Sequence, residues 1–249
     1  MSDAAAAPPV ASSAAFDAAL AAGRAAARAW LDAVPRDARL VVFCHFDADG
    51  LAAGALFGRA LPRLGFTHVD VVPSWRGESA FSDEARARLA ALRPAALVVT
   101  DLGVHRAGVL PGVPTLYVDH HLPDGTPPAP AVVVSGYAWN PIPCSAWLAH
   151  DLLAPLAAEA GAPLDDVAWL GAVGTISDLG ERAPWAPLAA LRKRHTAKWL
   201  KEAVALVNAA RRASAFDVDT PLHALLTADG PRVLTTNAPI DPAAEARAA

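Results

Sequence analysis

The chain has 249 residues, of which 54% are hydrophobic and 18% charged, so it can bury the core of one large domain or two small ones. Its formal net charge of −4, from 25 acidic and 21 basic residues, argues against a protein held to nucleic acid mainly by bulk charge, although a local basic groove stays open. Two cysteines, Cys44 and Cys144, are too few for a disulfide framework, so we expect a reducing, cytoplasmic setting. No apolar run approaches the roughly 20 residues that span a bilayer, and no membrane partner is expected.

The first half of the chain alternates helical patterns with short apolar runs. Helices are expected at 16–34, 51–64 and 82–92, the last with Ser82 as its N-cap. Strands are expected at 39–44, 67–72, 96–100, 114–118 and 131–135. This alternation predicts an α/β fold built on a doubly wound, mostly parallel sheet flanked by helices.

The second half is predicted to be helical. A loop with four prolines at 123–130 precedes helical patterns at about 145–160, 165–175 and 187–212. The last of these is locally basic, which fits either a surface that follows a phosphate backbone or the solvated face of a long helix. A helical C-terminal part therefore follows the sheet.

Four short acidic segments stand out against this background. Three of them directly follow predicted strands, and the fourth follows a helical stretch: 45–50, Thr100-Asp101, Asp119-His120-His121 and Ser177-Asp178. In parallel sheets, ligands bind beyond the carboxyl ends of the strands. Carboxylates and imidazoles gathered there would bind divalent metal, which predicts metal-assisted chemistry on a phosphate ester.

The first segment has the pattern His45-x-Asp47-x-Asp49-Gly50. Side chains alternate along an extended chain, so the three ligand-type groups can point to one side, and Gly50 permits a tight turn into the next helix. Such a set suits a hard or borderline cation such as Mn²⁺ or Mg²⁺. A turn in which Asp49 caps the following helix explains this segment equally well.

Taken one at a time, the other segments are less specific. Asp101 alone is better explained as a helix or turn cap, and Asp178 alone is an ordinary loop aspartate. Asp119-His120-His121 is harder to explain by packing, with a solvated turn as the alternative. The combination of all four segments is what points to a metal site.

In this order the four segments resemble the motifs of the DHH phosphoesterase superfamily. Two further features resemble its RecJ-like branch. The pair Asn140-Pro141 precedes a helix that starts at Ser145, and Asn208 begins a stretch similar to Asn-Ala-Ala-Gly-Arg, with Arg211 where glycine is usual.

The resemblance implies a site with two ions, Mn²⁺ or Mg²⁺. It implies these metal ligands: His45, Asp47, Asp49, Asp101, His120 and Asp178. Asp101 would bridge both ions, Asp47 with His45 nearby would hold the first, and the remaining three would hold the second. His121 would contact the scissile phosphate or protonate the leaving oxygen, and Asp119 would orient the histidine pair. Asp101, Asp119 and His121 are thus the expected catalytic residues.

The implied function is hydrolysis of phosphodiester or phosphomonoester bonds, as in a RecJ-like exonuclease. The expected substrates are single-stranded nucleic acid, oligonucleotides or nucleotides. One alternative is a small phosphoanhydride hydrolase, but the pyrophosphatase branch has its first-motif histidine further upstream, where this chain has Phe43. Another is a non-catalytic scaffold that binds a nuclease or replication partner, although such relatives usually lose motif residues that this chain keeps.

The resemblance covers about residues 38–182 and gives the expected organisation. We expect a flexible tail at 1–15, a catalytic domain at 16–182, a helical extension packed on it at 183–228, and a linker-like tail at 229–249. The family normally adds a second domain with a Gly-Gly-Gly-His-type motif, which is not found in this sequence. A partner chain or missing domain would then complete the cleft, and His121 should be more exposed than the metal ligands.

Overall fold

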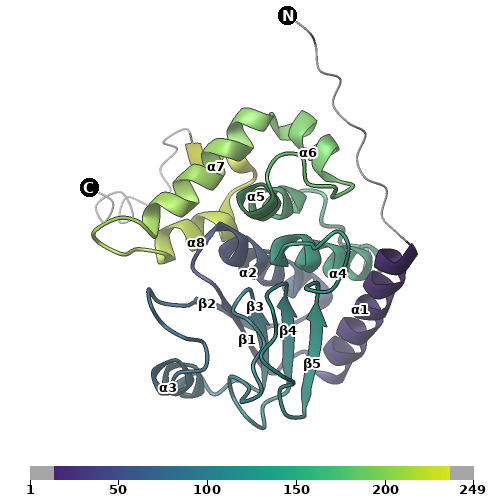
Figure 1. The fold of residues 1–249 in the computed structure, drawn as a ribbon, viewed down its shortest axis with the longest axis vertical. Coiled ribbons are helices and arrows are strands. Elements are labelled where there is room, and N and C mark those ends of the chain that lie inside the picture. Colours follow the sequence, from purple (N-terminus) through teal and green to yellow (C-terminus); the bar gives the residue numbers. More distant parts are fainter. Residues whose placement is uncertain (1–13, 236–249) are drawn as a thin grey trace, which may run out of the picture.

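The computed structural model describes residues 14–235, and a five-stranded parallel sheet lies at its centre (Figure 1). The strands are β1 (Arg39–Cys44), β2 (His68–Pro73), β3 (Ala96–Thr100), β4 (Thr115–Asp119) and β5 (Ala131–Ser135). Their order is β2-β1-β3-β4-β5, and every neighbouring pair is parallel. This order is one of the two common doubly wound arrangements, and it places a topological switch point between β1 and β3. The predicted fold class is confirmed.

Helices surround the sheet and fill the C-terminal part of the described chain. They are α1 (Ala14–Ala33), α2 (Ala48–Ala60), the 3₁₀ helix η1 (Pro62–Leu64), α3 (Asp83–Ala91), α4 (Ser145–Glu159), α5 (Ala168–Leu179), α6 (Leu188–His195), α7 (Ala197–Ala210), α8 (Asp219–Thr227) and α9 (Pro231–Thr235). Ser82 caps α3 as predicted, because its side chain accepts a hydrogen bond from the Ala85 backbone N–H. Strands and helices therefore alternate in the first half of the chain and helices follow in the second half, as predicted.

Alternating side chains of the buried strands point into two separate cores. Leu40 and Val42 of β1 belong to a large core with α1, α2, α4 and α5, whereas Val41 and Phe43 belong to a smaller one with α3. Figure 1 shows α3 apart from the other helices, across the sheet. Since both faces are covered, the strands can be continuously apolar, which is the pattern seen in the sequence.

Three local details differ from the sequence-based expectations. Helix α2 begins at Ala48, with Asp47 as its N-cap, so Asp49 lies in the first helical turn and not in an extended segment. The expected long helix at 187–212 is interrupted at Thr196, whose φ of 66° is incompatible with an α-helix. Helix α5 continues to Leu179, so Asp178 lies in its last turn instead of in a loop.

Within the expected extension at 183–228, α7 packs on α5 and α8 packs on α2. The expected tails at 1–15 and 229–249 lie mostly outside the described residues. The parts inside are helical, since α1 begins at Ala14 and residues 231–235 form α9. Within 14–235, no helix combines the length and apolar character needed to cross a bilayer.

Candidate metal centre

The carboxyl ends of three neighbouring strands bring the predicted site residues together. His45 and Asp47 follow β1, Asp101 follows β3, and the Asp119-His120-His121 segment ends β4. Their strands are adjacent in the sheet, and α5 adds Asp178 from the helical part. The site therefore lies at the switch point between β1 and β3, where doubly wound sheets bind ligands.

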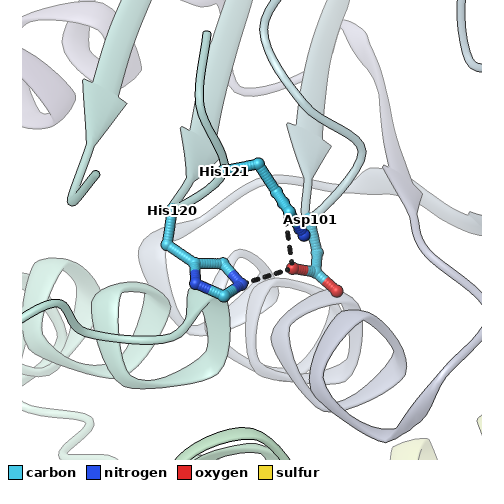
Figure 2. A group of neighbouring side chains, drawn as sticks. All are labelled: Asp101, His120 and His121. Carbon is cyan, nitrogen blue, oxygen red and sulfur yellow. Dashed lines mark ion pairs between the residues drawn. The ribbon is translucent and has the colours of Figure 1, made fainter.

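Asp101 lies at the centre of this group. Its backbone has a φ of 62°, which turns the chain sharply at the end of β3, and its side chain is buried. One carboxylate oxygen, Oδ1, lies 3.2 Å from His120 Nε2 and 3.9 Å from His121 Nδ1, and the other, Oδ2, lies 3.5 Å from His45 Nδ1. Figure 2 shows both histidines of the β4 end directed toward this carboxylate. Ser145 Oγ donates a hydrogen bond of 2.9 Å to Oδ1 and fixes the group.

Asp49 is held at the beginning of α4. Its carboxylate accepts hydrogen bonds from the backbone N–H groups of Ser145 (2.8 Å) and Ala146 (3.0 Å), which have no partner within their own helix. Gly174 of α5 makes room for it, because a Cβ there would lie 2.5 Å from Asp49 Oδ1. Burial, reinforced by the charges of Asp101 and Asp178, raises the pKa of Asp49 well above its usual value. A positive charge would relieve this repulsion.

His45 and Asp47 form a pair on the β1 side, with 3.1 Å between Nδ1 and Oδ2. Asp47 also caps α2 by accepting a hydrogen bond from Gly50 N. Burial alone would lower the pKa of His45, but hydrogen bonds to Asp101 and Asp47 raise this pKa to about 10. Burial also works against ionised Asp47, yet the hydrogen bond and charge of His45 lower its pKa to about 2. A protonated His45 thus offsets part of the negative charge of Asp47 and Asp101.

His120 plays the corresponding part on the α5 side. Its Nε2 atom lies 3.3 Å from Asp178 Oδ2 and 3.8 Å from Asp49 Oδ2. Burial opposes protonation of His120, but its hydrogen bond to Asp101 and the nearby carboxylates raise its pKa. Burial and the charge of Asp101 raise the pKa of Asp178. Asp178, like Asp49, is therefore a carboxylate whose ionised form is destabilised by burial and by the charge of Asp101.

Asp119 and His121 are arranged differently from the ligand-type groups. The buried Asp119 carboxylate accepts hydrogen bonds of 2.7 Å from Gly103 N and His121 N, and its Oδ1 lies 3.1 Å from His121 Nδ1. This contact raises the pKa of His121 to about 9. The His121 side chain is 53% exposed, against 29% for Asp178 and less for the other ligand-type groups, so His121 is more exposed than the expected metal ligands, as predicted.

Three overlapping groups of side chains in the described part of the chain could each hold a metal ion. They are His45–Asp47–Asp101, Asp101–His120–His121 and Asp49–His120–Asp178, with ligand atoms within 4.8 Å of one another in each group. Carboxylate oxygens supplemented by imidazole suit Mn²⁺ and Mg²⁺. The residues present therefore fit a site for these ions, and Asp101 is common to two of the groups.

Several supporting residues were not assigned a role from the sequence. Ser145 and Gly174 position Asp49, and Asn208 joins two site elements by accepting from Ala48 N (3.3 Å) and donating to Ser177 Oγ (3.1 Å). Arg211 Nη1 approaches Asp47 Oδ2 at 3.8 Å. The Asn-Ala-Ala stretch signalled this region, but the sequence alone did not say what it contacts.

The locally basic stretch is partly engaged within the protein. Lys201 and Arg192 contact the Glu181 carboxylate at 3.4 and 3.3 Å, and Arg194 donates to the backbone oxygen of Asp165. These side chains are therefore partly neutralised or tied to the helices that carry them. The contacts favour the solvated-helix interpretation for this part of the stretch.

Comparisons with known proteins give consistent matches, although no family model matches the chain. The single-stranded-DNA-specific exonuclease RecJ of Escherichia coli is 34% identical over 108 residues, which cover 39% of this chain and 18% of that protein. A solved structure of exonuclease RecJ bound to manganese has a TM-score of 0.62 and 27% identity over 86% of this chain and 62% of that one.

Two further solved structures match. RecJ from Thermus thermophilus in complex with Mn²⁺ has a TM-score of 0.62 and 25% identity, over 96% of this chain and 38% of that one. The DHH domain of a member of a ribosomal-protein family matches in fold alone, with a TM-score of 0.66 and 16% identity over 95% of this chain and 63% of that one. The chain spans less than two thirds of the length of each of these four relatives.

Proposed function

We propose that the chain, which is similar to RecJ exonucleases, is a metal-dependent phosphoesterase of the RecJ-like branch of the DHH superfamily. The observation that carries the proposal is the position of Asp101. Its two carboxylate oxygens face different sides of the site, with His120 near one and His45 near the other. Such a carboxylate is placed to bridge two cations.

The cofactors that fit the donor set are two ions of Mn²⁺ or Mg²⁺. Asp47 and His45 would hold the first, the other three ligands would hold the second (Asp49, His120 and Asp178), and Asp101 would belong to both. When bound, such ions activate water as a nucleophile and neutralise negative charge on a phosphate. The ions would also relieve the carboxylate repulsion that raises the pKa of Asp49 and Asp178.

His121 is the group placed to meet the substrate. It is the most exposed of the clustered side chains, and Asp119 fixes its ring through Nδ1. The hydrogen bond to Asp119 raises the pKa of His121, which favours a protonated imidazole that can give its proton to a leaving oxygen. Asp119 keeps this orientation because its carboxylate is itself held by Gly103 N and His121 N.

We assign single-stranded nucleic acid, oligonucleotides or nucleotides as the substrate class, with exonuclease action of the RecJ type. The E. coli relative is specific for single-stranded DNA, which supports this choice. The exposed His121 supports an open site whose second wall comes from a partner chain or a further domain. Weak substrate binding is expected without that wall.

A hydrolysis assay tests the proposal. In the presence of Mn²⁺, the chain is incubated with one of three substrates at a time: a single-stranded oligonucleotide, a nucleotide ester or pyrophosphate. Asp101→Asn should lower turnover by at least about 10²-fold while the fold is retained. Asp124→Asn is the matched control, since Asp124 is an aspartate paired with Arg106 outside the site. Turnover of Asp101→Asn within about tenfold of the unaltered chain would refute the metal role of Asp101.

Two outcomes separate the alternatives. Cleavage of pyrophosphate alone would indicate a phosphoanhydride hydrolase. No turnover with any substrate, together with unimpaired metal binding, would indicate a scaffold protein. Hydrolysis of oligonucleotides that requires metal and Asp101 is the result that the proposal predicts.

A further inference from the structure

Trp75 is the one exposed tryptophan in the described part of the chain. It is 55% exposed, whereas Trp147, Trp169 and Trp185 are almost completely buried. It lies two residues beyond the end of β2, at the carboxyl ends of the strands, where the metal centre is also found.

The ring is held in place by a buried ion pair. The Arg88 guanidinium lies 4.4 Å from the centre of the Trp75 ring and covers one of its faces. Arg88 Nη2 in turn contacts Glu78 Oε2 at 2.6 Å, and the Glu78 side chain is only 6% exposed. The same Glu78 oxygen accepts a hydrogen bond from the Trp75 backbone N–H at 2.9 Å. Backbone and ring are thus both fixed, while much of the residue stays open to solvent.

The register of the sheet puts Trp75 close to the metal centre. Pro73 pairs with Cys44, and Ser74 N donates to Cys44 O at 2.8 Å, so Trp75 lies beside the segment that begins with His45.

A second connection runs through the next residue. Arg76 Nη2 donates to the backbone oxygens of Arg211 (2.5 Å) and Ala213 (2.9 Å). Arg211 is the residue whose guanidinium approaches Asp47. The loop that carries Trp75 is therefore tied to the same segment that lies over the first metal-binding group.

We propose that Trp75 is a stacking platform for a nucleobase of the substrate whose phosphate lies at the metal centre. This inference rests on the proposed function and deepens it, because it assigns a preference for base-bearing substrates over phosphates without a base. A π-face stacks on every base, so the platform tolerates any sequence. Its rigid support means that little side-chain freedom is lost on binding.

Binding of two matched ligands tests the platform. A fluorescein-labelled oligothymidylate and an abasic strand of the same length are titrated by anisotropy in EDTA, where no hydrolysis occurs. Trp75→Ala should weaken oligothymidylate binding by about 5- to 150-fold, which corresponds to the stacking energy of one base. The abasic strand should bind equally to both proteins, and Trp75→Phe should stay within about threefold of the unaltered chain. Tyr137→Ala is the control, because Tyr137 is 42% exposed but follows β5, at the opposite edge of the sheet.

The outcomes separate this inference from the proposed function. Equal losses for both strands in Trp75→Ala, or no loss for either, would overturn the platform. If Trp75→Ala unfolds, the test uses the tryptophan fluorescence of the unaltered chain and of Trp75→Phe, whose difference is the emission of Trp75. Oligothymidylate should quench this Trp75 emission, and absence of quenching refutes the platform. Trp75-dependent binding in a chain that hydrolyses nothing would uphold the platform and refute the proposed function. Hydrolysis by the unaltered chain, together with unchanged binding by Trp75→Ala, would uphold the proposed function and refute the platform.

Discussion

Replacing Gly174 by alanine should move a metal ligand without removing it. The new Cβ would lie 2.5 Å from Asp49 Oδ1 and still closer to the Cβ of Ala146, whereas ordinary contacts are 3.4 Å or longer. Relieving the short contact needs about 1 Å of movement. Asp49 and Ala146 belong to the packed helices α2 and α4, so neither can move easily. Metal ligands tolerate only about 0.2 Å. Affinity for Mn²⁺ should therefore fall by about 10- to 100-fold.

Folding stability should change less than metal affinity in this variant. Overpacking costs about 1–3 kcal/mol, but alanine favours the helix over glycine by about 1 kcal/mol, so the net loss is about 0–2 kcal/mol. The assay is thermal unfolding with and without Mn²⁺, combined with a calorimetric titration. Gly230→Ala is the control, because its Cβ would meet its nearest neighbour, His195, at 3.7 Å. Unchanged Mn²⁺ affinity in Gly174→Ala would refute the packing argument.

Two further predictions concern the same cluster. Ser145→Ala removes the 2.9 Å hydrogen bond to Asp101, so Mn²⁺ affinity should fall about tenfold, and an unchanged calorimetric affinity would contradict this. In EDTA, the free energy of unfolding should fall as pH rises from 6.5 to about 10, because His45 and His121, with pKa values raised from 6.5 to about 10 and about 9, stabilise the fold only while they are protonated. Denaturant titrations at several pH values measure this, and stability that rises over the range would refute the assignment.

The parallel sheet and its strand ends could be predicted because both depend on local patterns. Continuous apolar runs such as 96–100 indicate strands buried on both faces, and Asp101 and Asp119 stand where these runs end. The carboxyl ends of parallel strands meet at one edge, so the approach of Asp101 to His120 followed from topology alone. The interruption at Thr196 could not be foreseen, since helical periodicity continues on both sides of it.

Contacts between distant segments were outside the reach of the sequence. The pairing of Asp49 with the N-terminus of α4 joins residues 96 positions apart, and the bond from Ala48 to Asn208 joins residues 160 apart. No periodicity encodes such pairs, because they depend on how helices dock on the sheet. Trp75 was missed for a related reason: its contact with Arg88 of α3, which is paired with Glu78, depends on how α3 docks beside the loop after β2.

The number of Mn²⁺ ions bound per chain tests the central claim most directly. Calorimetric titration of the chelator-treated protein should give two ions per chain, and Asp101→Asn should bind at most one, with at least about tenfold weaker affinity. Asp124→Asn should bind two ions as the unaltered chain does. A stoichiometry of one or none in the unaltered chain, or two ions bound with unchanged affinity by Asp101→Asn, would contradict a centre that is bridged by Asp101.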